Sequence, residues 1–273
     1  MGAWGRRQLV IMGVALAALL VGAVAQAQFG RGFRGARLAS DNDFDRRFQY
    51  CRLFYRGAGF GGGGGWQTDY PMAEQNLSVR LGELTRLNVS KVAGRPNPVI
   101  VGIGTDQMFQ CPFIIMSAPG SSFFSDSDAA SLREYLLKGG MLWTDDSWGS
   151  FQWSNWTAQI GKVLPPSEYP IVDIPLTHGL FNAQFEITEI PQIPNIGFWL
   201  RSGHQTSEQG ADSATPYVKG ILDKKGNIMV MSTHNTDIAD SWEREGEDVG
   251  YFYAMSPRGY AFAVNAVLYA HTH

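Results

Sequence analysis

Cysteine and histidine are scarce in this sequence, and each scarcity excludes a kind of metal or redox site. Two cysteines and five histidines occur among 273 residues. Neither cysteine belongs to a CxxC motif, so a zinc ribbon or a dithiol redox centre is not expected. No second histidine lies within four residues of His234, which removes the spacing typical of a histidine-rich metal site. The glycine run at 57–66 lacks the GxxxxGK[ST] pattern that would make it a phosphate cradle.

Basic runs are also missing. The chain carries 22 Lys and Arg against 25 Asp and Glu, and 44% of its residues are hydrophobic. Without residues 1–27, which hold two arginines and no acid, 20 basic and 25 acidic side chains remain. This modest acidity argues against nucleic acid as a partner and against a polybasic membrane patch. The apolar fraction is sufficient for a proper buried core.

The N-terminus has the pattern of a secretory signal peptide. Arg6 and Arg7 precede an apolar stretch over Leu9–Val24, and Ala25-Gln26-Ala27 forms a small-x-small cleavage site. We expect cleavage after Ala27 and a periplasmic or secreted protein with no stable membrane span; the alternative is an anchor that is retained. Residues 28–46 are expected to form a flexible leader, and 47–273 a single α/β domain.

Export leaves the state of the two cysteines open. An oxidising compartment permits a disulfide between Cys51 and Cys111. Two small buried hydrophobic side chains are the alternative, because pairing depends on a geometry that spacing does not supply.

The stretch from Pro112 to Ser150 predicts a strand, a helix and a second strand. Phe113–Met116 is a short apolar run typical of a buried strand. Ser125–Ser127 supplies helix-capping side chains, and apolar residues then recur at helical spacing over Ala129–Leu137. After Gly139 and Gly140, a second strand starts at Met141 and continues into Asp145. In open parallel sheets ligands bind at the carboxyl ends of strands, so any site is expected there.

The rest of the chain continues this alternation. Further strands are predicted at 48–55, 89–92, 99–103, 217–222 and 227–231, and further helices at 73–87, 151–163 and 256–270. Alternating strands and helices of these lengths indicate an α/β fold, a three-layer sandwich with a mostly parallel central sheet.

Several marks coincide along the chain: Asp69-Tyr70-Pro71, Cys111-Pro112-Phe113, Lys138-Gly139-Gly140 before Asp145-Asp146, and the late segments STHNTDIADSWE and NAVLYAHT. Together they resemble the bacterial domain of unknown function 4159 over Phe48 to Thr272. The resemblance implies a class I glutamine amidotransferase-like, flavodoxin-like fold, and it names no reaction.

True amidotransferases carry a cysteine at a strand-to-helix elbow. The equivalent turn here reads Asp145-Asp146-Ser147-Trp148-Gly149, without a cysteine. A thioester mechanism needs a thiolate at that point, so glutaminase activity is not expected.

Polar residues at predicted strand ends supply the candidate site. Asp145, Asp146 and His234 are the candidates for catalysis, with helix capping as the plain structural alternative for the two carboxylates. Asn235 and Asp237 follow the same strand as His234 and are candidates for ligand binding, with a stabilised turn as the alternative. Asp69 and Asp106 close segments that should also end near this edge, and both are candidates for ligand binding.

No residue is assigned as a metal ligand, and no cofactor is predicted, although a divalent metal ion stays open. If Asp69, Asp145 and Asp237 converged, their mutual repulsion would raise their pKa values or recruit a cation. Trp148, with tryptophans 143, 153 and 156, could hold a sugar ring beside the carboxylates; half-buried packing is the alternative.

Two function hypotheses result. The first is an exported, non-catalytic binding or scaffold domain, with a protein partner in the cell envelope or a small-molecule or sugar ligand. The second is a hydrolase-like or carbohydrate-handling enzyme that uses a carboxylate and His234, with or without a divalent metal. The enzyme hypothesis requires these side chains to lie within a few ångströms of one another in an open pocket.

Overall fold

The computed structural model describes residues 36–57 and 65–273. The chain divides into two compact units, Met1–Leu38 and Ala39–His273, and residues 36–38 are the described part of the first. The expected signal peptide, residues 28–35 of the expected leader and residues 58–64 of the glycine run lie outside the described residues. The rest of this section concerns the second unit.

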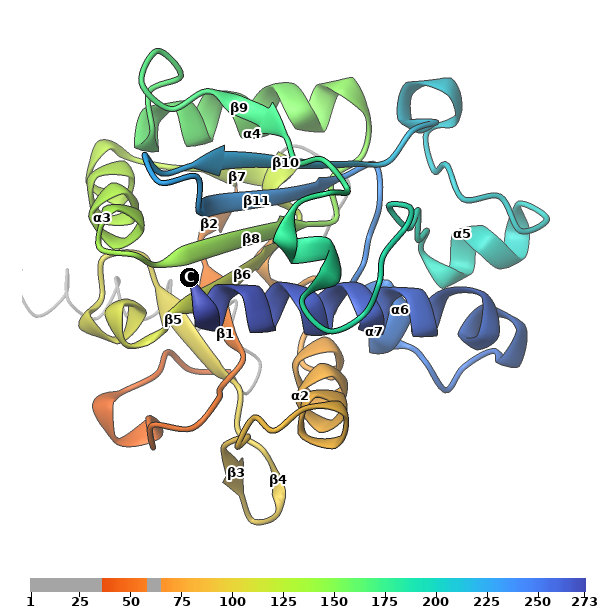
Figure 1. Cartoon of the computed structure of the whole chain (residues 1–273), viewed down its shortest axis with the longest axis horizontal. Helices are drawn as coiled ribbons and strands as arrows, with labels where there is room; N and C mark the ends of the chain where they lie inside the picture. Colours follow the sequence, from red (N-terminus) through yellow and green to blue (C-terminus); the bar gives the residue numbers. More distant parts are fainter. Residues whose placement is uncertain (1–35, 58–64) are drawn as a thin grey trace, which may run out of the picture. The chain divides into compact units, whose positions relative to one another are not determined.

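A seven-stranded sheet forms the centre of this unit (Figure 1). Five adjacent strands, β5, β1, β6, β8 and β11, are parallel to one another, whereas β10 runs antiparallel to both β11 and β9. The sheet is therefore mostly parallel, as the sequence predicts. In spatial order the strands are β5 (Val99–Gly102), β1 (Cys51–Phe54), β6 (Phe113–Ser117), β8 (Met141–Asp145), β11 (Ile228–His234), β10 (Tyr217–Leu222) and β9 (Ile171–Asp173).

Shorter elements surround the sheet. Two small antiparallel sheets of two strands each pair β2 (Arg56–Gly57) with β7 (Ser122–Phe123) and β3 (Lys91–Val92) with β4 (Arg95–Pro96). The α-helices are α2 (Met72–Leu84), α3 (Asp126–Leu137), α4 (Gly149–Val163), α5 (Ile196–Arg201), α6 (Asp240–Glu243) and α7 (Val249–Thr272). Single 3₁₀ turns include η2 (Gly65–Gln67), η3 (Asp106–Gln110) and η5 (Gly179–Asn182).

Helices cover both faces of the sheet, as the contacts around β8 show. Its successive side chains point to opposite faces. Trp143 packs against Phe262 of α7, with ring centroids 5.6 Å apart. The next residue, Thr144, hydrogen-bonds Ser232 on the other face, where Trp156 of α4 also donates to Ser232. In Figure 1 the long α7 crosses one face of the sheet.

The predicted βαβ unit is confirmed with its boundary signals. Ser125 caps α3: its hydroxyl accepts from the backbone N–H of Asp128, whose carboxylate accepts from the backbone of Ser125 in return. Beyond the helix, Gly139 takes a left-handed backbone with φ of 98°, which favours glycine. The strands Phe113–Ser117 and Met141–Asp145 then pair in parallel register.

Several boundaries differ from the sequence prediction: α2 ends at Leu84 rather than at 87, and β11 extends to His234 rather than ending at 231. The terminal helix is predicted to begin at Ser256 but begins at Val249, because Asp248 caps it by accepting from the backbone N–H of Tyr251 at 2.7 Å. Pro257 lies inside this helix and cannot donate to the carbonyl of Tyr253. Tyr253 is 74% exposed, so water can solvate that carbonyl. Asp106 does not end a strand: β5 stops at Gly102, and Asp106 opens η3 instead.

Cys51 and Cys111 form a disulfide, with their Cα atoms 6.2 Å apart. It joins the first residue of β1 to the loop that leads into β6. The open question about these cysteines is thereby settled in favour of pairing, and no free cysteine remains. Within 36–57 and 65–273, no helix combines the length and apolar character needed to span a bilayer.

Candidate functional site

A buried ion pair joins β1 to α2. Arg52 on β1 and Glu74 on α2 are both completely buried, and the Arg52 Nε donates to a carboxylate oxygen of Glu74. Removing two charges from water is costly unless they are paired and hydrogen-bonded. The pair therefore ties α2 to the sheet at one defined position.

The same guanidinium shapes the loop before α2. Its Nη1 donates to the carbonyl oxygens of Trp66 at 3.2 Å and Thr68 at 2.9 Å, and to the hydroxyl of Ser117 at 2.7 Å. The following residue, Asp69, has a left-handed backbone with φ of 65°. Arg52 thus fixes the segment from which the Asp69 carboxylate projects.

Two further carboxylates come from the short helix α6, beyond the end of β11. Asp240 is 1% exposed and Glu243 is half-buried. Oxygen atoms of Asp69, Asp240 and Glu243 lie within 4.8 Å of one another, so the three could contact one metal ion. We call these three residues the carboxylate cluster.

Burial and mutual repulsion make the carboxylate cluster hard to ionise. Burial raises the pKa of Asp69 well above its usual range, and the charge of Asp146 raises it further. For Asp240 burial also acts first, followed by the charge of Asp69. The pKa of Glu243 is raised chiefly by burial. The three carboxyls therefore favour the protonated form unless a cation compensates their charge.

Unpartnered polar atoms gather around the carboxylate cluster. Buried polar groups in folded proteins are normally hydrogen-bonded, and exceptions often mark a bound water or ion. Six buried side-chain atoms within the described residues have no such partner, and each belongs to Arg52, Asp69, Glu74 or α6, or to a residue within two positions of Arg52 or Asp69. They are Tyr50 Oη, Arg52 Nη2, Thr68 Oγ1, Asp69 Oδ2, Glu74 Oε2 and Trp242 Nε1.

Asp145 and Asp146, adjacent in sequence, have different environments. Asp145 is 1% exposed and accepts from the Thr233 hydroxyl and, at 2.8 Å, from the backbone N–H of Ala239. Burial raises its pKa to about 6 against these hydrogen bonds. It joins the end of β8 to the segment that leads into α6, a positioning contact for the carboxylate cluster.

Asp146 occupies the turn between β8 and α4. Its backbone is left-handed, with φ of 61°, and its side chain is half-buried. The indole Nε1 of Trp148 donates to Asp146 Oδ1 at 3.1 Å. Burial, followed by the charge of Asp145, raises the pKa of Asp146 to about 7. The charge of Asp146 also raises the pKa values of Asp69 and Asp240, so it belongs to the same electrostatic group.

Asp237 is also buried beside this group. Its Oδ1 accepts from the backbone N–H of Asp240 at 3.1 Å, at the start of α6. Burial raises its pKa well above the usual range, and the charges of Asp240, Asp69, Asp146 and Asp145 add to the effect in that order. The structure therefore brings Asp69, Asp145 and Asp237 into mutual electrostatic contact.

The family model for a domain of unknown function, DUF4159, matches residues 51–271. The chain belongs to the DUF4159 family. The match includes every residue of the carboxylate cluster together with Arg52 and Glu74. A comparison with curated proteins finds no match.

His234, the histidine candidate of this DUF4159 domain, makes its contacts with residues outside the carboxylate cluster. The ring of His234 packs on Trp153, with centroids 4.6 Å apart, and its Nδ1 lies 3.3 Å from the Ser147 hydroxyl. Burial lowers the pKa of His234 to about 4, so the ring is neutral at pH 7. Asn235 bridges two loops instead: its Oδ1 accepts from Gly149 N–H, and its Nδ2 donates to the carbonyl of Thr215.

Asp106 and most of the tryptophans are also placed away from a binding role. Asp106 is exposed at the start of η3, and its charge does not contribute to the raised pKa values of the cluster. Trp148 is 3% exposed, and Trp143 and Trp156 are each 1% exposed. Of the four tryptophans considered for sugar stacking, Trp153 alone is half-buried.

Sequence reasoning missed Asp240, Glu243 and the Arg52–Glu74 pair. A signal for the first two was present in the segment DIADSWE, where Asp237, Asp240 and Glu243 recur every three residues, as on one face of a helical turn. Arg52 had no such signal, because an arginine inside an aromatic strand is only informative once its carboxylate partner is known.

Proposed function

We propose that this DUF4159 domain is an exported binding domain that holds a divalent cation in the carboxylate cluster. The observation that carries the proposal is the combination of three convergent carboxylates with six unpartnered buried atoms around them. Arg52, the only buried arginine among the residues that the structure describes, is already paired with Glu74. A cation would neutralise the repulsion that raises the pKa values of Asp69 and Asp240.

The donor set favours a hard cation. Carboxylate oxygens suit Ca²⁺, Mg²⁺ and Mn²⁺, whereas the softer metals prefer the imidazole and thiolate ligands that this cluster lacks. Asp69, Asp240 and Glu243 would bind the ion directly. Asp145 and Arg52 would position the two segments that carry these ligands, and binding would release protons from carboxyls whose pKa values are raised.

Calorimetric titration of the purified domain with Ca²⁺, Mg²⁺ and Mn²⁺, each run in two buffers of different ionisation enthalpy, tests the proposal. We expect one ion per chain, with a dissociation constant at or below about 1 mM, and proton release that grows as the pH falls toward 6. Asp240→Asn should abolish binding. Glu134→Gln, a substitution of an exposed carboxylate on α3 with a side chain that is 56% exposed, is the matched control and should bind as wild type does.

The contrary result is equally clear. If no binding is detected even at ion concentrations well above about 1 mM, or if Asp240→Asn and Glu134→Gln bind alike, the carboxylate cluster is not a cation site.

A cation-assisted hydrolase is the second candidate, and Asp146 favours it. This residue stands at the strand-to-helix turn, with a left-handed backbone and a pKa raised to about 7, beside the carboxylate cluster. Such turns present the nucleophile in several hydrolase folds. Hydrolysis of a panel of phosphate and carboxylate esters, dependent on cation and lost in Asp146→Asn with cation affinity retained, would support the enzyme. Retention of that hydrolysis in Asp146→Asn would exclude Asp146 as its catalytic group.

We also propose a periplasmic or secreted location, with a protein partner in the cell envelope. The N-terminal signal pattern and the Cys51–Cys111 disulfide support export, because such bonds persist in oxidising compartments. Glutaminase chemistry is excluded from the proposal, since both cysteines of the chain are joined in that bond. Fractionation of cells that express the tagged chain tests the location: recovery in the cytoplasm with an intact N-terminus would contradict it.

A further inference from the structure

A cavity opens at the edge of the sheet opposite the carboxylate cluster, and the residues that line it differ in character from the cluster. It has a volume of about 390 Å³, within the range of small-molecule sites. Cys51 begins β1 and Phe113 begins β6, so both mark the amino ends of parallel strands. His271 comes from the end of α7, and Leu87 and Asn88 follow α2. We call this cavity the amino-edge pocket.

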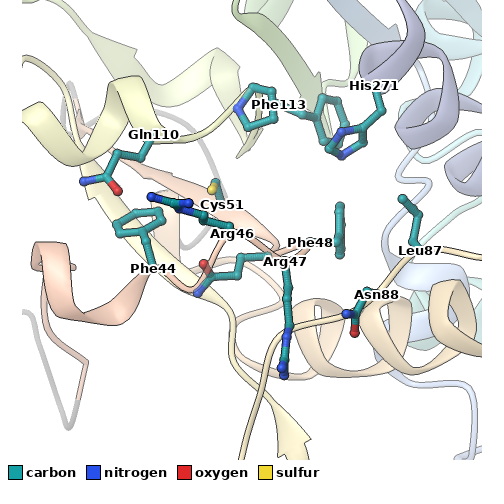
Figure 2. Close-up of a pocket in the computed structure, with 12 residues that line it drawn as sticks. Phe44, Arg46, Arg47, Phe48, Cys51, Leu87, Asn88, Gln110, Phe113 and His271 are labelled. Atoms are coloured by element: carbon teal, nitrogen blue, oxygen red, sulfur yellow. The ribbon is translucent and has the colours of Figure 1, made fainter.

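The walls of the amino-edge pocket are divided by character (Figure 2). On one side Figure 2 shows the Arg46 guanidinium near Gln110 and Phe44. On the other side lie Phe48, Leu87 and His271, where the rings of Phe48 and His271 meet edge to face at 5.8 Å. A ligand with a charged end and an apolar body matches this division.

The charge of the pocket is opposite to that of the chain. Its 12 lining residues include Arg46 and Arg47 and no carboxylate, although the whole chain has a net charge of −3. Arg47 lies 3.9 Å from Asp45, whereas Arg46 forms no ion pair or hydrogen bond with any other described residue. Burial lowers the pKa of His271, so that ring is neutral at pH 7 and adds no third charge.

The disulfide holds this arrangement in place. Cys51 lines the pocket, and its bond to Cys111 fixes the start of β1 to the segment between Gln110 and Pro112, both of which also line it. The site is therefore formed by covalently joined segments before any ligand arrives, which lowers the ordering cost of binding.

We propose that the amino-edge pocket binds a small organic anion with an aromatic or aliphatic body. Arg46 pairs with its carboxylate, sulfonate or phosphate group, for which a guanidinium provides several convergent donors. Phe48, Leu87 and Phe113 contact the body and exclude water from it. This site is separate from the carboxylate cluster and does not rest on cation binding there.

Two fluorescent probes with the same ring system test the proposal. The first is 8-anilinonaphthalene-1-sulfonate, an aromatic anion; the second is N-phenyl-1-naphthylamine, which lacks the sulfonate. We expect Arg46→Gln to weaken the sulfonate by about tenfold, the equivalent of one charge-assisted hydrogen bond, and to leave the neutral probe unchanged. Leu87→Ala should weaken both probes, because it removes part of the apolar wall.

Arg95→Gln is the matched control, since Arg95 is an equally exposed arginine on the β3–β4 hairpin, outside the pocket. It should bind both probes as wild type does. The proposal is overturned if Arg46→Gln binds the sulfonate as tightly as wild type, or if it weakens both probes equally. Calcium titration of Arg46→Gln should match wild type, so failure here and failure of the cation proposal are distinguishable.

Discussion

The two edges of the central sheet carry side chains of opposite charge. At the carboxyl edge, acidic side chains are buried together: Asp145, Asp237 and Asp240 are each under 5% exposed. At the amino edge, Arg46 and Arg47 are exposed around an open pocket without a carboxylate in its walls. The same seven strands support both arrangements.

This difference in charge and burial determines which ions or ligands each edge can bind. Buried carboxylates in mutual contact must be protonated or bind a cation, and either choice couples folding to solution conditions. Exposed arginines are solvated by water and cost the fold little, so they remain available to a ligand. The carboxyl edge is therefore expected to control stability, and the amino edge to contribute chiefly through its disulfide.

The largest expected effect comes from breaking the buried ion pair. Arg52→Met leaves Glu74 as an unpaired buried carboxylate and frees the Trp66–Thr68 segment, so we expect a loss of about 4 kcal/mol in the free energy of unfolding. Urea denaturation measures it. The double variant Arg52→Met with Glu74→Leu should recover part of the loss, because it removes the stranded charge. A loss below about 1 kcal/mol in the single variant would contradict the assigned role of the pair.

The disulfide gives the next largest effect, at the opposite edge. Replacing Cys51 and Cys111 together by serine releases a crosslink that spans 60 residues. We expect a loss of about 3 kcal/mol, measured by urea denaturation beside oxidised wild type. Cation affinity should be retained, since the carboxylate cluster lies at the other edge. A variant that loses cation binding while still folded would show that the two edges are coupled.

The raised pKa values at the carboxyl edge predict the direction in which stability changes with pH. A carboxyl with a raised pKa binds protons more tightly in the folded state, so stability falls as the pH rises through that pKa. Asp146, with a pKa raised to about 7, and the more strongly raised Asp69 and Asp240 act in this direction. His234, with a pKa lowered to about 4, acts oppositely, but only below its unfolded value near 6.5.

The informative window is therefore pH 6.5 to 8, in the presence of a chelator. We expect a loss of about 2 kcal/mol across it, seen as a drop in Tm of about 4–8 °C. Asp240→Asn or saturating Ca²⁺ should flatten this slope, and Glu134→Gln should not. A chelated wild-type protein whose Tm rises over the same window would refute the mutual repulsion of these carboxyls.

The smallest expected effect sharpens the comparison between the two edges. Arg46→Gln changes an exposed, unpaired side chain, so stability should remain within about 0.5 kcal/mol of wild type. Measured beside Arg52→Met, it contrasts an exposed arginine of the pocket with a buried arginine of the core. A loss of more than about 1 kcal/mol would mean that Arg46 supports the fold, and its assignment to ligand binding would then lose its basis.

Local patterns in the sequence determined much of this architecture. The apolar runs of β6 and β8, the capping residues Ser125–Ser127 and the left-handed Gly139 define the βαβ unit through contacts that span only a few residues. The carboxyl edge could likewise be named as the place for a site, because Asp145 directly ends a predicted strand. Periodicity and caps are local properties, so a sequence displays them openly.

Only the tertiary structure decided which residues meet at each edge. Asp69 and Asp240 are brought together because Arg52 reaches across to the loop before α2, while Asp145 holds the segment before α6. Left-handed backbones at Asp69 and Asp146 set where these side chains point, and φ values of that sign have no reliable mark in an aspartate. Convergence of this kind depends on contacts between distant segments, and local residue patterns do not encode those distances.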